Sequence, residues 1–244
     1  MFDVGLTGLE LAIGAGVVVV AAALQGSIGF GLAVLSVPIL TVVDPVFTPI
    51  PTLILSLFVG VGTLVRERGD LDLEGLGWVI SGRVPGALLG AWVLSIATER
   101  ALGIIIGVIV LLAVGVLSSG LSVRLSRISR VIAGLISGFS GTSAGIGGPP
   151  IALLYGRQAG PVVRSTLGAI FTIGITINLL ILTAVGILTT SDIGVAVLLS
   201  PAMILGFFIS GRLRPHVDGE RVRIGILAVS SVAAVSLLVT SIAG

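Results

Sequence analysis

Two glycine-rich stretches interrupt the apolar chain, and both carry hydroxyl or amide groups that can bind an anion. The first, "QGSIGFG", covers residues 25–31, and the second, "GTSAGIGGPP", covers 141–150. Glycine permits a positive φ and close backbone approach, and proline is tolerated at the first turn of a helix. Each stretch is therefore predicted to end one helix and begin another. The free N–H groups at such a helix start favour an anion.

The candidate substrate-binding residues lie in these two stretches, with one charged residue added from elsewhere in the chain. Hydroxyl and amide groups donate hydrogen bonds without a fixed charge, which suits an anion that must be bound and then released. The usual alternative for such serines and threonines is that they cap the backbone. The candidates are Gln25, Gly26, Ser27, Gly29, Gly31, Arg83, Thr142, Ser143, Gly145, Gly147 and Gly148.

Arg83 is the sharpest individual candidate because it lies inside an apolar segment, at 75–96. An ionisable residue within a membrane span is a functional hypothesis by default. The commoner alternative, which the sequence favours, is that this arginine snorkels to the inner membrane interface. Asn178, inside a later apolar segment, is expected to form a hydrogen bond between helices rather than to line a substrate path.

The composition places these residues in a membrane protein. Hydrophobic residues make up 55% of the chain and charged residues only 10%, whereas a soluble domain has about 25% charged residues. A multi-pass protein of the cell (inner) membrane is expected, with the lipid bilayer as its surroundings and no nucleic-acid partner. Ten apolar segments are predicted, at 9–24, 30–43, 46–65, 75–96, 101–118, 128–140, 148–158, 162–188, 193–211 and 222–242.

The second and seventh of these segments are too short to cross a bilayer, which needs about 20 helical residues. Each follows one of the two glycine-rich stretches, so both are expected to be broken or re-entrant helices. Most of the 13 basic residues, all arginine, lie in or beside odd-numbered loops. The positive-inside rule then predicts that the N- and C-termini both lie on the non-cytoplasmic side.

An internal repeat relates the two stretches. A shift of 116 residues superimposes Gly29, Gly31, Pro85 and Gly90 on Gly145, Gly147, Pro201 and Gly206. Five segments per half would place the second half upside down, which is a common plan for secondary transporters. The alternative is coincidence in a chain with 36 glycines. The predicted fold is an all-α helical bundle of two inverted five-segment repeats, 1–120 and 121–244, whose broken helices meet at the membrane midplane.

Several kinds of chemistry are disfavoured by what the sequence lacks. It contains no cysteine, no lysine and one histidine, His216, so neither a nucleotide-binding P-loop nor an ordinary metal site is expected. Acidic residues are confined to loops and span ends, which disfavours cation antiport. No enzymatic activity and no cofactor are expected. Proton coupling through a protonated form of the substrate stays open.

The order and duplication of these motifs resemble the TauE/SafE sulfite exporter family of membrane permeases. The stretches that carry the resemblance are "GSIGFGLAVLSVPIL" and "GTSAGIGGPPIALLYG", followed by "RVPGALLGAWV" and "SPAMILGFFISGRL". The resemblance covers about residues 10–242 and implies a secondary transporter of small sulfur-containing anions, such as sulfite or organosulfonates. A passive anion channel and a non-transporting structural or accessory subunit are the alternatives. The particular anion, the direction of flux and the oligomeric state stay open.

Overall fold

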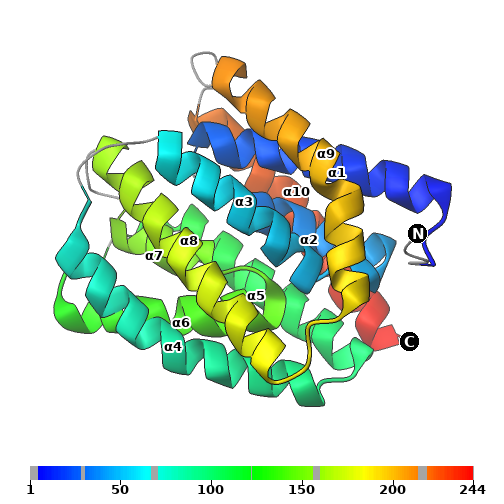
Figure 1. The fold of residues 1–244 in the computed structure, drawn as a ribbon, viewed down its shortest axis with the longest axis horizontal. Helices are drawn as coiled ribbons and strands as arrows, with labels where there is room; N and C mark the ends of the chain where they lie inside the picture. Colours follow the sequence, from blue (N-terminus) through cyan, green and yellow to red (C-terminus); the bar gives the residue numbers. More distant parts are fainter. Residues whose placement is uncertain are drawn as a thin grey trace.

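The computed structural model describes residues 5–28, 31–66, 71–121, 123–155, 160–213 and 219–243, and within these ranges the regular structure is helical, without strands. The prediction of an all-α fold is confirmed. The elements are α1 (Gly8–Ile28), α2 (Leu32–Val43), the 3-10 turn η1 (Pro45–Phe47), α3 (Ile50–Arg66), α4 (Leu73–Ile96), α5 (Glu99–Ser118), α6 (Arg127–Ala144), α7 (Gly148–Tyr155), α8 (Gly160–Ala184), α9 (Thr190–Leu213) and α10 (Gly219–Ala243), as Figure 1 shows.

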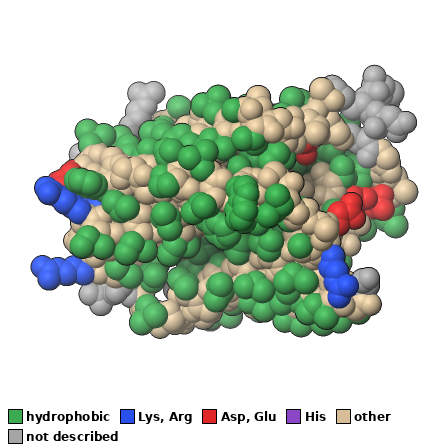
Figure 2. Space-filling model, turned by 90° about the horizontal axis from the view of Figure 1, so that it is seen from below, with side chains coloured by type: hydrophobic (Ala, Val, Ile, Leu, Met, Phe, Trp, Pro, Cys, Tyr) green, Lys and Arg blue, Asp and Glu red, His purple; other side chains and the backbone are tan. Residues whose placement is uncertain are grey.

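Seven helices in the described part of the chain are long and apolar enough to cross a membrane, namely α1, α3, α4, α5, α8, α9 and α10. One face of the molecule has hydrophobic side chains across its middle and charged side chains at its two ends (Figure 2). A multi-pass membrane protein is therefore confirmed. The helices α2 and α7 have only 12 and 8 residues, as expected for the second and seventh segments.

Both glycine-rich stretches separate two helices, as predicted. α1 ends at Ile28, and α2 begins after Gly31, whose φ of 118° is one that residues with a Cβ atom rarely adopt. α6 ends at Ala144 and is capped by Gly145, whose φ is 73°. The side chain of Gln25 spans the first break, because its Oε1 accepts a hydrogen bond from the Leu32 backbone N–H at 3.0 Å. Gly29 lies outside the described residues.

Glycines bring the backbones of α4 and α6 into direct contact. A Cβ atom at Gly82 or Gly86 of α4 would overlap the carbonyl group of Val131 or Leu135 on α6. Gly134 and Gly138 of α6 meet α4 in the same way. Small residues at such spacings let membrane helices approach closely. This contact fixes the position of α4, the helix that carries Arg83.

The helix pairs follow a regular pattern when α1–α5 are compared with α6–α10. α1 packs on α9, and its counterpart α6 packs on α4. In the same way, the contact of α2 with α10 corresponds to that of α7 with α5, and the contact of α3 with α9 corresponds to that of α8 with α4. The contacts of α3 with α8 and of α5 with α10 each join a helix to its own counterpart. Exchanging each helix with the one five places along therefore reproduces these contacts.

Candidate functional site

A small cavity lies where the two helix breaks meet. Its volume is about 40 Å³, and since one water needs about 10–15 Å³ of such space, it has room for a few atoms of a small ligand. The two stretches are more than a hundred residues apart in sequence, yet both contribute to its wall. The lining residues are Gln25, Gly31, Ala33, Val34, Leu53, Ser56, Arg83, Gly141, Gly145, Gly147, Gly148, Phe171 and Ile175.

Arg83 of α4 supplies the positive charge of this cavity. The residue is only 1% exposed, and its Nη1 donates a hydrogen bond to the Ser137 hydroxyl oxygen at 2.6 Å. That hydroxyl in turn donates to the Gly147 carbonyl oxygen at 2.5 Å, which links the guanidinium to the second break. The expectation that Arg83 snorkels to the membrane interface is therefore wrong, since its side chain is buried and bonded inside the protein.

The charge of Arg83 is not neutralised by any acidic side chain in the described part of the chain. No carboxylate of those residues lies within ion-pair distance of the guanidinium, and its Nε has no hydrogen-bond partner. A Cβ atom at Gly174 of α8 would overlap this Nε, so only glycine leaves space for the guanidinium at that position.

Two neutral polar side chains, Asn178 and Ser56, are also buried without a hydrogen-bond partner. Asn178 of α8 is 0% exposed, and neither its Nδ2 nor its Oδ1 has a hydrogen-bond partner. The expected hydrogen bond between helices is therefore not formed. Asn178 Nδ2 and Arg83 Nη2 lie 3.0 and 3.3 Å from the position that a Cβ atom would take at Gly141. Ser56 of α3 lines the cavity, and its hydroxyl is unpaired as well.

Of the candidate substrate-binding residues that the structure describes, six line the cavity and four do not. The six are Gln25, Gly31, Arg83, Gly145, Gly147 and Gly148. The four outside the lining are Gly26, Ser27, Thr142 and Ser143.

The four residues outside the lining make contacts within the helix bundle. Ser27 and Ser143 donate hydrogen bonds, each of 2.7 Å, to backbone carbonyls one turn earlier in their own helices. The Gly26 carbonyl accepts a hydrogen bond from Arg66. Thr142 packs against Gly90 of α4. The hydroxyls of Ser27 and Ser143 thus bond to the backbone, which was the alternative to a role in anion binding.

Sequence reasoning missed Ser56, Ser137 and Gly174. A single serine or glycine in a long apolar helix gives no signal of its own, because its role depends on which helix packs against it. Ser137 could have been noticed, since it lies on α6 among small residues that are three or four positions apart, a spacing typical of close helix contacts.

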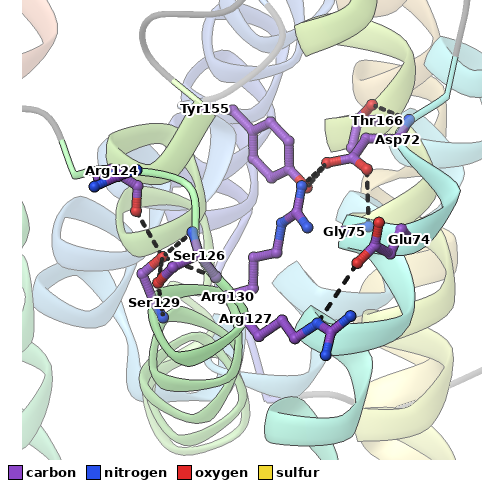
Figure 3. A network of polar contacts seen from close by, with 10 residues as sticks. All are labelled: Asp72, Glu74, Gly75, Arg124, Ser126, Arg127, Ser129, Arg130, Tyr155 and Thr166. Carbon is purple, nitrogen blue, oxygen red and sulfur yellow. Dashed lines mark hydrogen bonds and ion pairs between the residues drawn. The ribbon is translucent and has the colours of Figure 1, made fainter.

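A separate polar network joins α4, α6, α7 and α8, and Figure 3 shows it; in α8 the Thr166 hydroxyl accepts from the Asp72 backbone N–H at 3.3 Å. Asp72, at the start of α4, accepts hydrogen bonds from Arg130 Nη2 of α6 at 2.7 Å and from the Tyr155 hydroxyl of α7 at 3.0 Å. Its Oδ1 accepts from the Gly75 backbone N–H at 2.8 Å. The network thus fixes the far end of the short helix α7 to the α4–α6 pair.

Seven candidate spans, two broken helices and a buried cavity define the class of the chain as a polytopic membrane protein with an internal site. Residues 14–237 match the family model described as sulfite exporter TauE/SafE. The chain therefore belongs to the TauE/SafE sulfite exporter family, and the resemblance seen in the sequence is confirmed. Membership makes it a membrane transport protein. Neither a curated protein nor a solved structure matches the chain.

Proposed function

We propose that the chain is a secondary transporter that carries small sulfur-containing oxyanions, such as sulfite or organosulfonates, across the cell membrane. The observation that carries this proposal is the buried guanidinium of Arg83, which has no acidic partner among the described residues. A buried ion without a counterion costs several kcal/mol. An anion in the adjoining cavity supplies the missing counterion and can leave again, whereas a carboxylate of the protein could not.

The two helix breaks add backbone groups to this anion site. Gly31 precedes the first turn of α2, and Gly147 and Gly148 begin α7; all three line the cavity together with Arg83. Helix N-termini present the positive end of the helix dipole to an anion. At α2 the Leu32 N–H is already bonded to Gln25, and Pro149 and Pro150 of α7 have no N–H, so few backbone donors are left for an anion. The candidate substrate-binding residues of the proposal are therefore Arg83, Gln25, Gly31, Gly145, Gly147 and Gly148.

The arrangement of the helices supports two inverted halves, 1–120 and 121–244, with the site between them. The helices α1 and α6 end 116 residues apart, and α2 and α7 begin 116 residues apart. The contacts between helices also repeat when the halves are exchanged. Five helices in each half give opposite orientations in the membrane, and in such transporters the substrate binds near the midplane where broken helices meet.

A carrier fits the cavity better than a passive channel. A channel needs a continuous wet path, whereas this cavity measures about 40 Å³ and its lining includes the apolar residues Leu53, Phe171 and Ile175. A non-transporting accessory subunit has no use for a buried charge beside two helix breaks, and the family match argues against it.

Flux into proteoliposomes tests the proposal. The purified protein is reconstituted, and uptake of sulfite, thiosulfate, an alkyl sulfonate and a carboxylate is measured with and without a pH gradient. Saturable uptake of the sulfur oxyanions, with exchange of labelled for unlabelled substrate, is the expected result for a carrier. Uptake no faster than in protein-free liposomes for every sulfur oxyanion would refute the proposed function, and flux without exchange would identify a channel.

A further inference from the structure

We propose that the cavity selects singly charged oxyanions over doubly charged ones, so that sulfite is carried as hydrogen sulfite, together with its proton. The inference rests on the proposed transport of sulfur oxyanions and narrows it, because sulfate and thiosulfate carry two charges at every accessible pH. Its basis is the charge of the cavity wall. Among the lining residues that the structure describes, only Arg83 is ionisable.

The two helices packed on α4 add no free charge beside Arg83 within the described part of the chain. These helices are α6 and α8. The described side chains of α8, in residues 165–184, include no charged residue. On α6, Arg127 and Arg130 pair with the acidic residues at the start of α4. Because a guanidinium keeps its charge at any pH used for transport, Arg83 gives the cavity one lasting positive charge.

The remaining helices of the cavity wall keep their charged residues away from it. α2 and α7 contain none. Glu10 lies in the first turn of α1, whereas the break follows the last turn of that helix. Arg66, at the end of α3, binds the Gly26 carbonyl but does not line the cavity. It is exposed, so water and salt screen its charge.

The two helix breaks add little net charge to the cavity. α2 and α7 begin at the breaks, while α1 and α6 end there. Gln25, in the last turn of α1, and Gly145, which caps α6, line the cavity together with the residues that begin α7. At each break, the positive end of one helix dipole is therefore offset by the negative end of another. The charge of Arg83 is the one that a substrate must balance.

A doubly charged anion in this cavity would leave one negative charge without a partner. The cavity measures about 40 Å³, and one water needs about 10–15 Å³ of such space, so the anion must shed most of its hydration shell. A buried ion without a counterion is strongly disfavoured. Sulfite takes up a proton near neutral pH, and the resulting hydrogen sulfite carries the single charge that Arg83 balances. Proton coupling then needs no carboxylate of the protein.

The test compares methanesulfonate with sulfate in proteoliposomes, because both are tetrahedral and similar in size but differ by one charge. The pH is equal on both sides, and uptake by protein-free liposomes is subtracted. The wild-type protein is expected to take up methanesulfonate about tenfold or more faster than sulfate, because an unpaired buried charge is so costly.

The pH dependence of sulfite uptake tests the same inference through the substrate's own proton. At a fixed total concentration well below KM, sulfite uptake should fall as the pH rises above neutrality, approaching about tenfold per pH unit for one bound proton. Methanesulfonate keeps its single charge, so its uptake should stay constant over the same range. A titrating group of the protein would instead lower the uptake of both anions.

Arg66→Gln is the control for the count of charges. It removes the arginine beside the first break and should leave the ratio of methanesulfonate to sulfate uptake unchanged. The ratio is measured within each protein, and the wild-type comparison decides alone if Arg66→Gln does not assemble.

Four results would overturn the inference and leave anion transport standing. They are sulfate uptake that equals or exceeds methanesulfonate uptake, sulfite uptake that does not fall with rising pH, a parallel fall for sulfite and methanesulfonate, and a changed ratio in Arg66→Gln. Absence of both sulfite and methanesulfonate uptake at every pH would instead overturn the proposed function on which the inference rests.

Discussion

At the scale of single residues, the central feature is an arginine that is held in place without an acidic partner among the described residues. Ser137 accepts one hydrogen bond from the Arg83 guanidinium, and Gly174 leaves the space that the guanidinium occupies. Asn178 approaches the same point as the guanidinium, since its Nδ2 and Arg83 Nη2 lie 3.0 and 3.3 Å from the position of a Cβ atom at Gly141. The amide is similar in shape to a carboxylate but carries no charge, so the positive charge of Arg83 stays available to a substrate.

Asn178→Asp tests this role of the amide. A carboxylate at this position would pair with Arg83 and compete with the substrate, because opposite charges attract strongly in a poorly hydrated interior. We expect the flux of sulfur oxyanions to fall about tenfold or more, which corresponds to about 1.4 kcal/mol or more. The measurement is uptake into proteoliposomes that contain equal amounts of monodisperse protein. Wild-type uptake by Asn178→Asp would contradict the idea that Arg83 must remain unpaired.

The sequence predicts the residues of this site only where a local signal marks them. Gly31, Gly145 and Gly147 could be predicted because closely spaced glycines interrupt a helix whatever surrounds them. Ser56 and Gly174 could not, because they become part of the site only through the packing of α3 and α8 against α4. The burial of Arg83 has the same origin, since its apolar segment alone favours a snorkelling side chain.

At the scale of helices, the contact between α4 and α6 positions the site. The two helices touch through glycines, and α6 also supplies Ser137, the partner of Arg83. The short helix α7 begins at the cavity and is fixed at its other end by Asp72 and Arg130. Both arrangements keep the guanidinium and the second break at a constant separation.

Gly86→Leu is expected to disrupt the α4–α6 contact. Overpacking a well-packed core costs about 1–3 kcal/mol, and here the new side chain would meet the backbone of Leu135, which cannot rotate away. The predicted result is a large loss of monodisperse protein on size-exclusion chromatography in detergent. Gly77→Leu is the matched control on the same helix, because a Cβ atom there meets nothing within 4 Å. Equal yields of monodisperse protein for Gly86→Leu and Gly77→Leu would show that the close contact between α4 and α6 is not required for folding.

Asp72→Asn is expected to loosen the end of α7. The substitution removes a charge that accepts hydrogen bonds from Arg130 and Tyr155, and bonds to charged groups contribute about 1.5–3 kcal/mol each. Thermal unfolding in detergent should show a clearly lower Tm. Glu74→Gln, which removes the exposed pair with Arg127 at 3.8 Å, should change the Tm little because exposed ion pairs contribute about 0–1 kcal/mol. A similar Tm for both variants would argue against a structural role of the network.

At the scale of the whole molecule, the membrane class and the order of the ten helices could be predicted from hydropathy, glycine and proline. The contacts between helices far apart in sequence could not, because apolar faces of similar composition do not specify their partners. The association of α1 with α9 and of α4 with α6 is therefore information that only the structure supplies.

The distribution of arginines predicts that both termini lie on the non-cytoplasmic side of the membrane. Because the chain contains no cysteine, single-cysteine variants report on one position each. Ala243→Cys, at the C-terminal end of α10, should react with a membrane-impermeant maleimide in intact cells. Ser119→Cys, between α5 and α6, should react only after the cells are opened. The reverse pattern of labelling would show that the predicted orientation is wrong.

The most direct test of the central claim is the flux of a sulfur oxyanion through Arg83→Gln in proteoliposomes. Glutamine keeps a hydrogen-bonding side chain but removes the charge that the substrate is proposed to neutralise. Arg100→Gln is the control, because Arg100 is exposed at the start of α5 and does not line the cavity. We predict that Arg83→Gln loses nearly all sulfite or sulfonate uptake while its elution profile and Tm stay close to those of the wild type, and that Arg100→Gln transports normally. Wild-type uptake by well-folded Arg83→Gln protein would contradict the account.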